Sequence, residues 1–286
     1  MALSSASSFP YRGRFAPTPS GPLHFGSLIA AVASYLDARA HQGEWLVRIE
    51  DIDAPRAVAG ADLTILQQLH DHGFVWDGDV LYQSQRHERY QQALNQLTRK
   101  NLTYRCTCSR KQIKARGPYY TGVCRQRQKR TENSSIRFLN NQPVLEFNDA
   151  LMGRQKIEAP FAREDFVLYR RDKLFTYQLA VVIDDIDQGI TDIVRGADLL
   201  TASSWQINLW QQFTDRLPRF AHLPLALDAN GKKLSKQNHA PALDPDRVTE
   251  QLQAAFRFLG LAEVAAASPQ QMLSDATDHW AAMHLP

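Results

Sequence analysis

The sequence predicts an α/β fold built on a Rossmann-type, doubly wound parallel sheet. In its N-terminal part, short apolar runs alternate with stretches that have helical apolar spacing, and the turns between them are rich in Gly and Pro. A basic, cysteine-containing segment interrupts this pattern, and a short helical region follows at the end. The 286 residues, 44% hydrophobic and 22% charged, have the composition of a soluble globular protein with one large domain or two ordinary ones.

The first hundred residues predict the opening unit of such a sheet. A strand is expected at 11–15, followed by the turn cluster Pro17–Pro22 and by a helix from Gly26 or Ser27 to about Gln42. A strand at 45–49 completes a strand, turn, helix, strand unit. Further helices are expected at 60–73 and 83–98.

The segment from Arg99 to Arg130 has a different character. It holds eleven Lys and Arg residues, no Asp or Glu, and all three cysteines of the chain, Cys106, Cys108 and Cys124. An odd number of cysteines so close together is a poor disulfide framework and favours a metal site, although three reduced structural thiols would also explain them. The basic charge favours contact with a phosphate backbone, and a solvated basic face is the alternative.

The rest of the chain predicts a return of the α/β pattern. Strands are expected at 166–169, 180–183 and 190–194, a helix at 200–213, an apolar run at 222–227, a lysine-rich loop at 231–238 and a helix near 248–259. The predicted domain organisation is a first half of the α/β domain at 1–98, an inserted basic module at 99–165, the second half at 166–237 and a short helical segment at 238–286.

Neither the apolar runs nor the N-terminus indicates a membrane-spanning helix or a secretory signal. No run approaches the roughly 18 apolar residues of a spanning helix. The N-terminal residues lack the basic start and apolar centre of a secretory signal, so a cytoplasmic protein without a membrane partner is expected.

Two short motifs carry the chemistry. Leu23-His24-Phe25-Gly26-Ser27 lies at the first strand-to-helix corner, where unpaired amides suit a phosphate and His24 can donate a hydrogen bond to it. Lys232-Lys233-Leu234-Ser235-Lys236-Gln237 forms a cationic loop that could neutralise a triphosphate. Taken singly, each motif has an ordinary explanation that is preferred: a helix start with a half-buried histidine for the first and a solvated basic loop for the second.

Together and in this order, the two motifs resemble the paired signatures of class I aminoacyl-tRNA synthetases. The stretch from Gly13 to His24 resembles the opening of the glutamyl-tRNA synthetase branch, and Val47–Asp53, Leu174–Val182 and Ile193–Asp198 resemble further blocks of it. The resemblance runs from about Tyr11 to Pro241. It implies an ATP-dependent ligase in which His24, Gly26, Ser27, Lys233, Ser235 and Lys236 bind ATP, with His24, Lys233 and Lys236 as the catalytic side chains and Mg²⁺ accompanying the nucleotide.

The short C-terminal region indicates which branch of these synthetases the chain resembles. Only 49 residues, 238–286, follow the lysine loop, whereas a full glutamyl-tRNA synthetase continues into large anticodon-binding domains. The chain is therefore similar to the glutamyl-queuosine tRNA(Asp) synthetase family, as is the wording Lys233–Pro241. That family activates L-glutamate with ATP and attaches it to the queuosine base at the wobble position of tRNA(Asp). We expect a monomer with these substrates as its partners.

The same resemblance assigns two sets of side chains. The positions that line the amino-acid site in related synthetases correspond to Arg14, Ala16, Thr18, Glu50, Tyr177 and Arg195. Guanidinium groups suit the two carboxylates of glutamate, Glu50 suits its ammonium group, and a tyrosine hydroxyl can donate to a carboxylate. The family also implies a zinc-binding, acceptor-like module in which Tyr120 joins the three cysteines as a ligand.

Each pocket residue has an ordinary structural alternative. Glu50 could pair with Arg48, Tyr177 could fill the core with a satisfied hydroxyl, and Arg195 could pair with an aspartate of its own segment, Asp192 or Asp198. Two other functions also fit the motifs. One is a minimal glutamyl- or glutaminyl-tRNA synthetase that charges a 3′ end, and the other is a non-catalytic regulator that binds a synthetase ligand.

Overall fold

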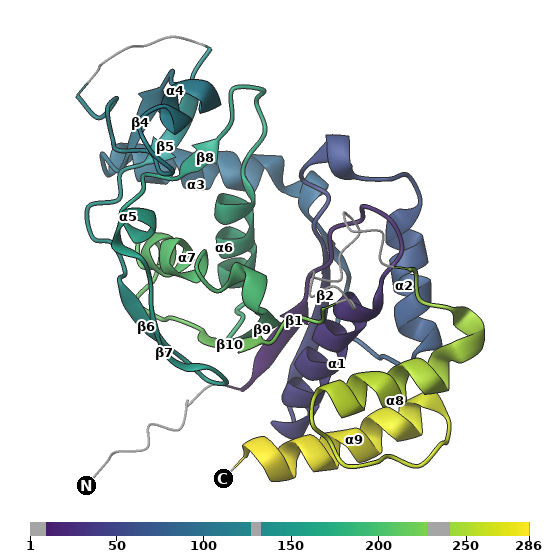
Figure 1. Cartoon of the computed structure of the whole chain (residues 1–286). Coiled ribbons are helices and arrows are strands. Elements are labelled where there is room, and N and C mark those ends of the chain that lie inside the picture. The colour runs from purple at the N-terminus through teal and green to yellow at the C-terminus, as the bar shows by residue number, and fades with distance from the viewer. Residues whose placement is uncertain (1–9, 127–132, 228–240, 286) are drawn as a thin grey trace, which may run out of the picture. The chain divides into compact units, whose positions relative to one another are not determined.

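The structure is a computed structural model that describes residues 10–126, 133–227 and 241–285 (Figure 1). The chain divides into two compact units, which are described separately below. The first comprises Met1–Tyr82, Ile190–Asp198 and Pro218–Pro286, and the second comprises Gln83–Gly189 and Leu199–Leu217. The lysine loop, with Lys233, Ser235 and Lys236, lies outside the described residues.

The first unit contains parallel strands. Its strands are β1 (Arg12–Phe15), β2 (Glu44–Ile49), β3 (Leu81–Tyr82), β9 (Asp192–Gly196) and β10 (Arg219–Leu223). Strand β2 pairs in parallel with both β1 and β3, and β9 pairs in parallel with β10. The amide of Thr191 donates to the carbonyl of Arg12 at 2.9 Å, which places the start of β9 beside β1.

Helix α1 (Phe25–Ala40) covers β1, β2 and β9. Its buried face includes Leu28, Ile29, Val32 and Leu36, the residues whose spacing predicted a helix here. The turn into β2 depends on Gly43, because a Cβ atom at this position would lie 2.5 Å from the carbonyl oxygen of Tyr11. Helix α2 (Ala61–Asp71) follows β2 in the chain.

Two C-terminal helices, α8 (Val248–Phe258) and α9 (Pro269–His284), pack against α1 and complete the first unit (Figure 1). Leu252, Phe256 and Trp280 are almost fully buried. Gly73, just after α2, has φ +81°, and a Cβ atom there would lie 2.7 Å from the backbone of Pro269, the first residue of α9. The C-terminal segment therefore belongs to the core of the first unit.

The second unit contains antiparallel strands and short helices. Its elements are α3 (His87–Arg99), β4 (Thr103–Cys106), α4 (Arg110–Lys114), β5 (Ser135–Phe138), β6 (Glu146–Asp149), β7 (Gly153–Lys156), α5 (Ala159–Ala162), β8 (Val167–Tyr169), α6 (Tyr177–Asp187) and α7 (Ser203–Trp210). Strands β4, β5 and β8 form one antiparallel sheet, and β6 and β7 form a hairpin.

Most of the expected elements are confirmed, and two expectations are wrong. The strands at 11–15 and 45–49 and the helices at 26–42, 60–73 and 248–259 are confirmed to within two residues. The expected strand at 180–183 lies inside helix α6, because a short continuous apolar run does not distinguish a strand from a helix that is buried all round. The strand near 166–169 exists, but it pairs antiparallel with β5 and so does not resume the parallel pattern.

The α/β prediction is therefore confirmed at the level of fold class. Among the described residues, no helix is long and apolar enough to cross a membrane.

Candidate active site and cysteine centre

The predicted phosphate-binding corner lies between β1 and α1. His24 is the N-cap residue of α1, and its Nδ1 accepts a hydrogen bond from the Ser27 amide at 3.3 Å. The Ser27 hydroxyl lies 3.3 Å from Nε2 of the same ring. The first turn of α1, all of whose residues are described, carries no acidic side chain. His24, Gly26 and Ser27 therefore meet at a helix N-terminus whose partial charge attracts anions.

The segment that follows the lysine loop is attached to this corner. Ala242 forms an antiparallel bridge with His24, and the Leu243 amide donates to the Leu23 carbonyl at 2.9 Å. Gln68 of α2 joins the two segments, because its Oε1 accepts from the Leu23 amide at 2.7 Å while its Nε2 lies 3.4 Å from the Leu243 carbonyl. No local pattern marks Gln68, because its partner Leu243 lies 175 residues away.

Most of the predicted glutamate-binding residues lie at the carboxyl ends of the strands. Arg14 lies near the end of β1 and Arg195 near the end of β9. The Glu50 amide, just after β2, donates to the Pro17 carbonyl at 2.9 Å. This hydrogen bond places Glu50 beside the turn that carries Ala16 and Thr18, at the sheet edge where ligands bind in open α/β folds.

One structural alternative for Glu50 is present in the molecule. Nη2 of Arg48 lies 3.4 Å from Oε1 of Glu50, and the side chains are 0% and 7% exposed. The carboxylate of Glu50 is thus already held by a buried cation. A substrate ammonium group would share this carboxylate with Arg48.

Arg195 has a partner that the sequence did not suggest. Its Nε donates to Nε2 of His222 at 3.1 Å, and the two residues face each other in register across β9 and β10. Asp192, one of the partners considered for Arg195, accepts from Arg219. His222 was part of an apolar run, so nothing in the local pattern set it apart.

Tyr177, the remaining glutamate-binding candidate, belongs to the second unit. It is the half-buried first residue of α6. Further along this helix, the fully buried Asp184 accepts hydrogen bonds from Gln83 at 2.8 Å, Arg86 at 2.6 Å and Tyr90 at 2.8 Å. These contacts fix α6 to the chain around α3 and so fix the backbone that carries Tyr177.

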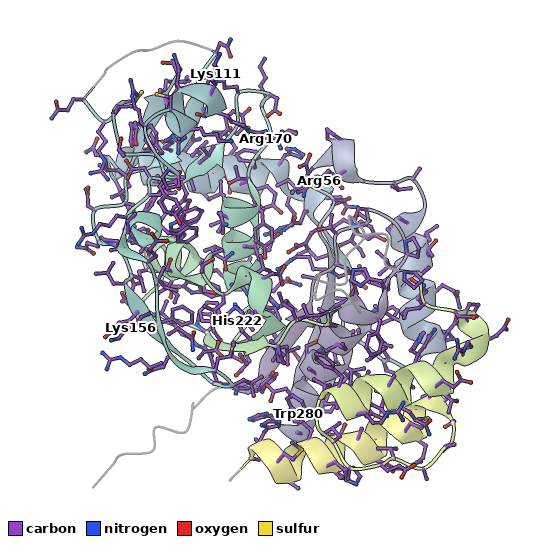
Figure 2. All side chains as sticks on the ribbon, in the orientation of Figure 1. Arg56, Lys111, Lys156, Arg170, His222 and Trp280 are labelled. Atoms are coloured by element: carbon purple, nitrogen blue, oxygen red, sulfur yellow. The ribbon has the colours of Figure 1, made fainter. Side chains whose placement is uncertain are left out.

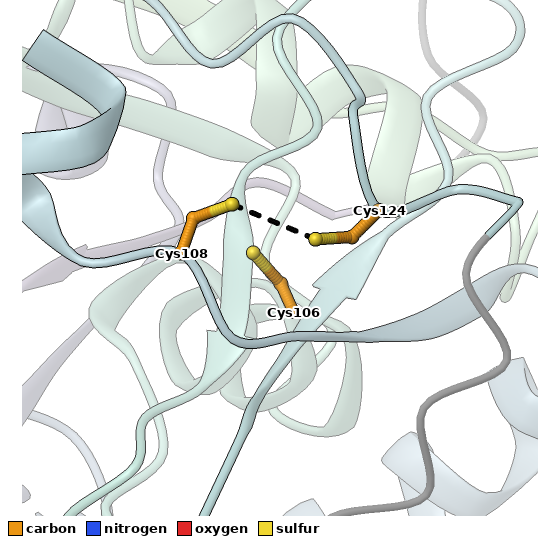
Figure 3. Close-up of side chains that lie close together, drawn as sticks. All are labelled: Cys106, Cys108 and Cys124. Carbon is orange, nitrogen blue, oxygen red and sulfur yellow. Dashed lines mark hydrogen bonds between the residues drawn. The ribbon is translucent and has the colours of Figure 1, made fainter. Parts of the chain in front are cut away.

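The three cysteines form a compact cluster in the second unit (Figure 3). Their sulfur atoms all lie within 4.8 Å of one another, and those of Cys108 and Cys124 are 3.5 Å apart. Cys106 and Cys124 are buried and Cys108 is half-buried. Strand β4 ends at Cys106, so the antiparallel sheet holds one side of the cluster.

Tyr120 and Arg137 border the same cluster. The Tyr120 hydroxyl accepts from the Cys124 amide at 2.8 Å, and the Arg137 guanidinium lies 3.8 Å from the centre of the Tyr120 ring. Burial raises the pKa of Cys106, but hydrogen bonds to Arg137 and to the Cys108 backbone outweigh burial and lower it to about 7. Burial and the neighbouring Cys124 and Cys106 raise the pKa of Cys108 to about 11.

The basic charge of this region is partly neutralised. Asp165, which is buried, accepts from Nε and Nη2 of Arg125 at 2.6 Å each and also from the Tyr104 hydroxyl. The basic side chains on and after α4 are exposed; they are Arg110, Lys111, Lys114 and Arg116 (Figure 2 labels Lys111). These residues can face a polyanion, whereas the guanidinium of Arg125 is already paired with the buried Asp165.

Comparison with known proteins shows the family to which the chain is similar. The family "tRNA synthetases class I (E and Q), catalytic domain" matches residues 11–275. A protein of Idiomarina loihiensis named glutamyl-Q tRNA(Asp) synthetase is 56% identical over 94% of this chain and 96% of its own length. One of the same name from Klebsiella pneumoniae is 54% identical over 94% and 93%.

The chain belongs to the glutamyl-Q tRNA(Asp) synthetase family.

As a member of this family of class I tRNA synthetases, the chain is an ATP-dependent ligase, as the sequence predicted. Among solved structures, a glutamate–tRNA synthetase of Elizabethkingia anophelis is similar, with a TM-score of 0.70 and 29% identity over 80% of this chain. This glutamyl-Q family member spans about half of that synthetase, 53% of its length. A methionyl-tRNA synthetase of Mycobacterium tuberculosis shares the fold alone, with a TM-score of 0.56 and 11% identity.

Proposed function

We propose that the protein activates L-glutamate with ATP and transfers the glutamyl group to the queuosine base at the wobble position of tRNA(Asp). The observation that supports this most strongly is the 56% identity to a glutamyl-Q tRNA(Asp) synthetase over nearly the full length of both chains. The C-terminal helices α8 and α9 are built into the first unit around α1.

The proposed reaction has two steps. A glutamate carboxylate oxygen attacks the α-phosphorus of ATP, the bond to the β-phosphate oxygen breaks, and glutamyl adenylate and pyrophosphate form. A hydroxyl of the queuosine base then attacks the activated carbonyl carbon, loses its proton, and releases AMP. No side-chain nucleophile is required in either step.

The ATP site is assigned to the β1–α1 corner together with the lysine loop. His24 and the amides of the first turn of α1, near Gly26 and Ser27, would hold phosphate oxygens. Lys233, Ser235 and Lys236 would neutralise the charge that develops on the phosphates. The attachment of Leu243 to Leu23 supports this assignment, since it ties the chain just after the loop to the corner. Magnesium would supply charge neutralisation on the departing pyrophosphate.

The glutamate site is assigned to the strand ends of the first unit. Tyr177, which belongs to the second unit, is a glutamate-binding candidate on the resemblance alone. Arg14 and Arg195 would bind the two carboxylates of glutamate. Glu50 would bind its ammonium group, and Arg48 would hold the Glu50 carboxylate in place. Ala16 and Thr18 would line the site from the turn beside Glu50. We propose that the strands of this unit form one doubly wound parallel sheet, which would bring these ends together.

The cysteine cluster is assigned as a structural zinc site with Cys106, Cys108, Cys124 and Tyr120 as ligands. Tetrahedral zinc–thiolate bonds of about 2.3 Å place sulfur atoms about 3.8 Å apart, which agrees with sulfurs that all lie within 4.8 Å of one another. Three thiolates this close repel one another, so a divalent cation would stabilise them. The Tyr120 hydroxyl oxygen lies 2.8 Å from the amide nitrogen of Cys124, and we assign it as the fourth ligand. The exposed basic residues on and after α4 would then approach the tRNA backbone.

The test of the first step is amino-acid-dependent exchange between ATP and pyrophosphate, carried out without tRNA and with each amino acid in turn. We expect exchange with glutamate alone. Exchange with glutamine instead would contradict the assigned specificity, and no exchange with any amino acid in the presence of magnesium would support a non-catalytic regulator.

Cytoplasmic location is proposed with this function, since ATP and tRNA are the substrates.

The position of the glutamyl ester on the tRNA distinguishes the proposed function from a minimal glutamyl-tRNA synthetase. A minimal glutamyl-tRNA synthetase would attach glutamate to the 3′ adenosine of tRNA(Glu), whereas the proposed function leaves that end uncharged. Removal of the 3′ nucleotides from the tRNA should therefore leave labelling intact.

A further inference from the structure

The buried carboxylate of Asp165 connects the two chain segments that carry the cysteines. Its side chain is 0% exposed, and it lies between α5 and β8. It accepts a hydrogen bond from the hydroxyl of Tyr104, which lies two residues before Cys106 on β4. It also accepts two hydrogen bonds at 2.6 Å each from Arg125, the residue after Cys124. One carboxylate thus holds both cysteine-bearing segments at the same point of the second unit.

The backbone of Asp165 supports the tyrosine of the cluster through Arg137. Nη1 of Arg137 donates to the Asp165 carbonyl at 2.6 Å, and the same nitrogen lies 3.7 Å from a carboxylate oxygen of Glu164. These contacts fix the guanidinium, which lies 3.8 Å from the centre of the Tyr120 ring. The stacked cation in turn holds this ring with its hydroxyl 2.8 Å from the amide nitrogen of Cys124.

We propose that Asp165 is a positioning residue for the cysteine cluster: it holds the two cysteine-bearing segments and the Tyr120 ring in metal-binding positions before a thiophilic divalent cation such as zinc arrives. Ligands that are already ordered bind an ion without the entropy cost of ordering them. The two side chains that donate to Asp165 are one and two residues from a cysteine, so loss of the carboxylate should displace the sulfur atoms. This inference rests on the proposed zinc site, and it assigns Asp165 no contact with the metal.

The experiment measures the zinc affinity of Asp165→Asn by competition with a chromogenic chelator. This variant keeps the size of the side chain but replaces one acceptor oxygen by an NH2 group, which cannot accept from Arg125 or Tyr104. We expect the zinc dissociation constant to rise roughly 10- to 100-fold, the usual cost of removing a group that supports a metal ligand. An unchanged dissociation constant overturns the inference. If Asp165→Asn does not fold, Arg125→Met decides by the same criterion, since the Arg125 side chain is 39% exposed and its loss leaves the core filled.

Asp184→Asn is the matched control for a purely structural role. Asp184 is another fully buried carboxylate of the second unit. It accepts hydrogen bonds from Gln83, Arg86 and Tyr90, which lie outside the cysteine-bearing segments. Both aspartate variants should lower the melting temperature, but only Asp165→Asn should weaken zinc binding. Equal losses of zinc affinity in the two variants would be a general effect of destabilisation and would overturn the inference.

A measurement without metal separates this inference from the proposed zinc site. Cys124 is 2% exposed, so its alkylation by iodoacetamide in the reduced, zinc-free protein requires its segment to open. Mass spectrometry should show several-fold faster alkylation of Cys124 in Asp165→Asn and Arg125→Met than in the original protein or Asp184→Asn. If the original protein binds no zinc but these rates differ as expected, the zinc assignment is wrong and the ordering of the cysteine segments by Asp165 stands. If the original protein binds zinc but neither the alkylation rates nor the zinc affinities differ, only the role of Asp165 is wrong.

Discussion

Trp280 donates a hydrogen bond from its indole nitrogen to Oδ1 of Asp37 at 3.0 Å, across 243 residues of sequence (Figure 2 labels Trp280). Asp37 lies on α1 and is 3% exposed. Its other carboxylate oxygen accepts from the Tyr11 hydroxyl at 2.6 Å and from Arg219. A single buried carboxylate thus joins the C-terminal helix α9 to α1, to the chain before β1 and to β10.

This relationship predicts that the C-terminal helix stabilises the core of the first unit. Trp280→Phe removes one hydrogen-bond donor and should lower the free energy of unfolding by about 1 kcal/mol, while Asp37→Leu leaves several buried polar groups without their acceptor and should cost about 3 kcal/mol or more. Urea denaturation measures both values. Asp278→Asn, at an exposed position of the same helix, is the control and should have almost no effect. Equal effects for Trp280→Phe and the control would contradict the prediction.

Tyr11 predicts a specific dependence of stability on alkaline pH. Burial, together with the charge of Asp37, raises the pKa of Tyr11 well above its usual 10.0. The unfolded chain therefore loses this proton near pH 10, whereas the folded chain keeps it, so the stabilisation is complete below pH 10 and is lost as the pH rises toward the folded-state pKa. Tyr11→Phe has no phenolic proton, so its stability has no contribution from this titration.

Urea denaturation from pH 8 to pH 11 should show this difference directly. The original protein should be more stable than Tyr11→Phe by about 1 kcal/mol at pH 8, the value of one hydrogen bond. The difference should shrink above pH 10, because only the original protein loses stability there through Tyr11. A difference that stays constant up to pH 11 would show that Tyr11 does not keep its proton in the fold.

We expect Gln68 to affect the KM for ATP, although it is not assigned any contact with substrate. Gln68→Leu removes the side-chain amide that joins Leu23, just before His24, to Leu243, just after the lysine loop. We expect the KM for ATP in pyrophosphate exchange to rise several-fold, because the two halves of the proposed phosphate site lose their shared support, while the KM for glutamate changes less. The neighbouring Gln67 is exposed and bonds to Asp71, four residues along the same helix, so Gln67→Leu is the matched control. If both variants bind ATP alike, the support by Gln68 is not needed.

The cysteine cluster predicts the metal content of the protein. Metal analysis of the purified protein should find about one zinc ion per chain, and Cys108→Ser should lower this content strongly because a weaker ligand replaces a thiolate. Thr107→Ser, one residue away, should retain the metal. Full zinc content in Cys108→Ser, or no zinc in a folded and active original protein, would make the cluster a group of structural thiols.

The sequence predicted the parts of the molecule that depend on local patterns. The corner at His24 could be located because Leu28 and its neighbours follow helical spacing directly after a Gly- and Pro-rich turn, and the cysteine cluster because its members are close in sequence. The run Ala180–Ile183 could not be assigned correctly, because a short continuous apolar run does not distinguish a strand from a buried helix.

The supporting residues of the site were beyond sequence reasoning for a similar reason. His222 contacts Arg195 through the register of two neighbouring strands, and Gln68 contacts a chain segment 175 residues away. Neither position has a local signal, since a histidine within an apolar run and a glutamine on a helix are common in any core or surface. Only the paired strands and the bridging amide reveal them.

The most direct test of the central claim is the transfer of labelled glutamate to purified tRNA(Asp) that either contains or lacks queuosine, with ATP and magnesium present. The account predicts label on the queuosine-containing tRNA(Asp), retained after its 3′ end is removed, and none on the tRNA that lacks queuosine. Equal labelling of both forms, with the label lost together with the 3′ adenosine, would contradict it.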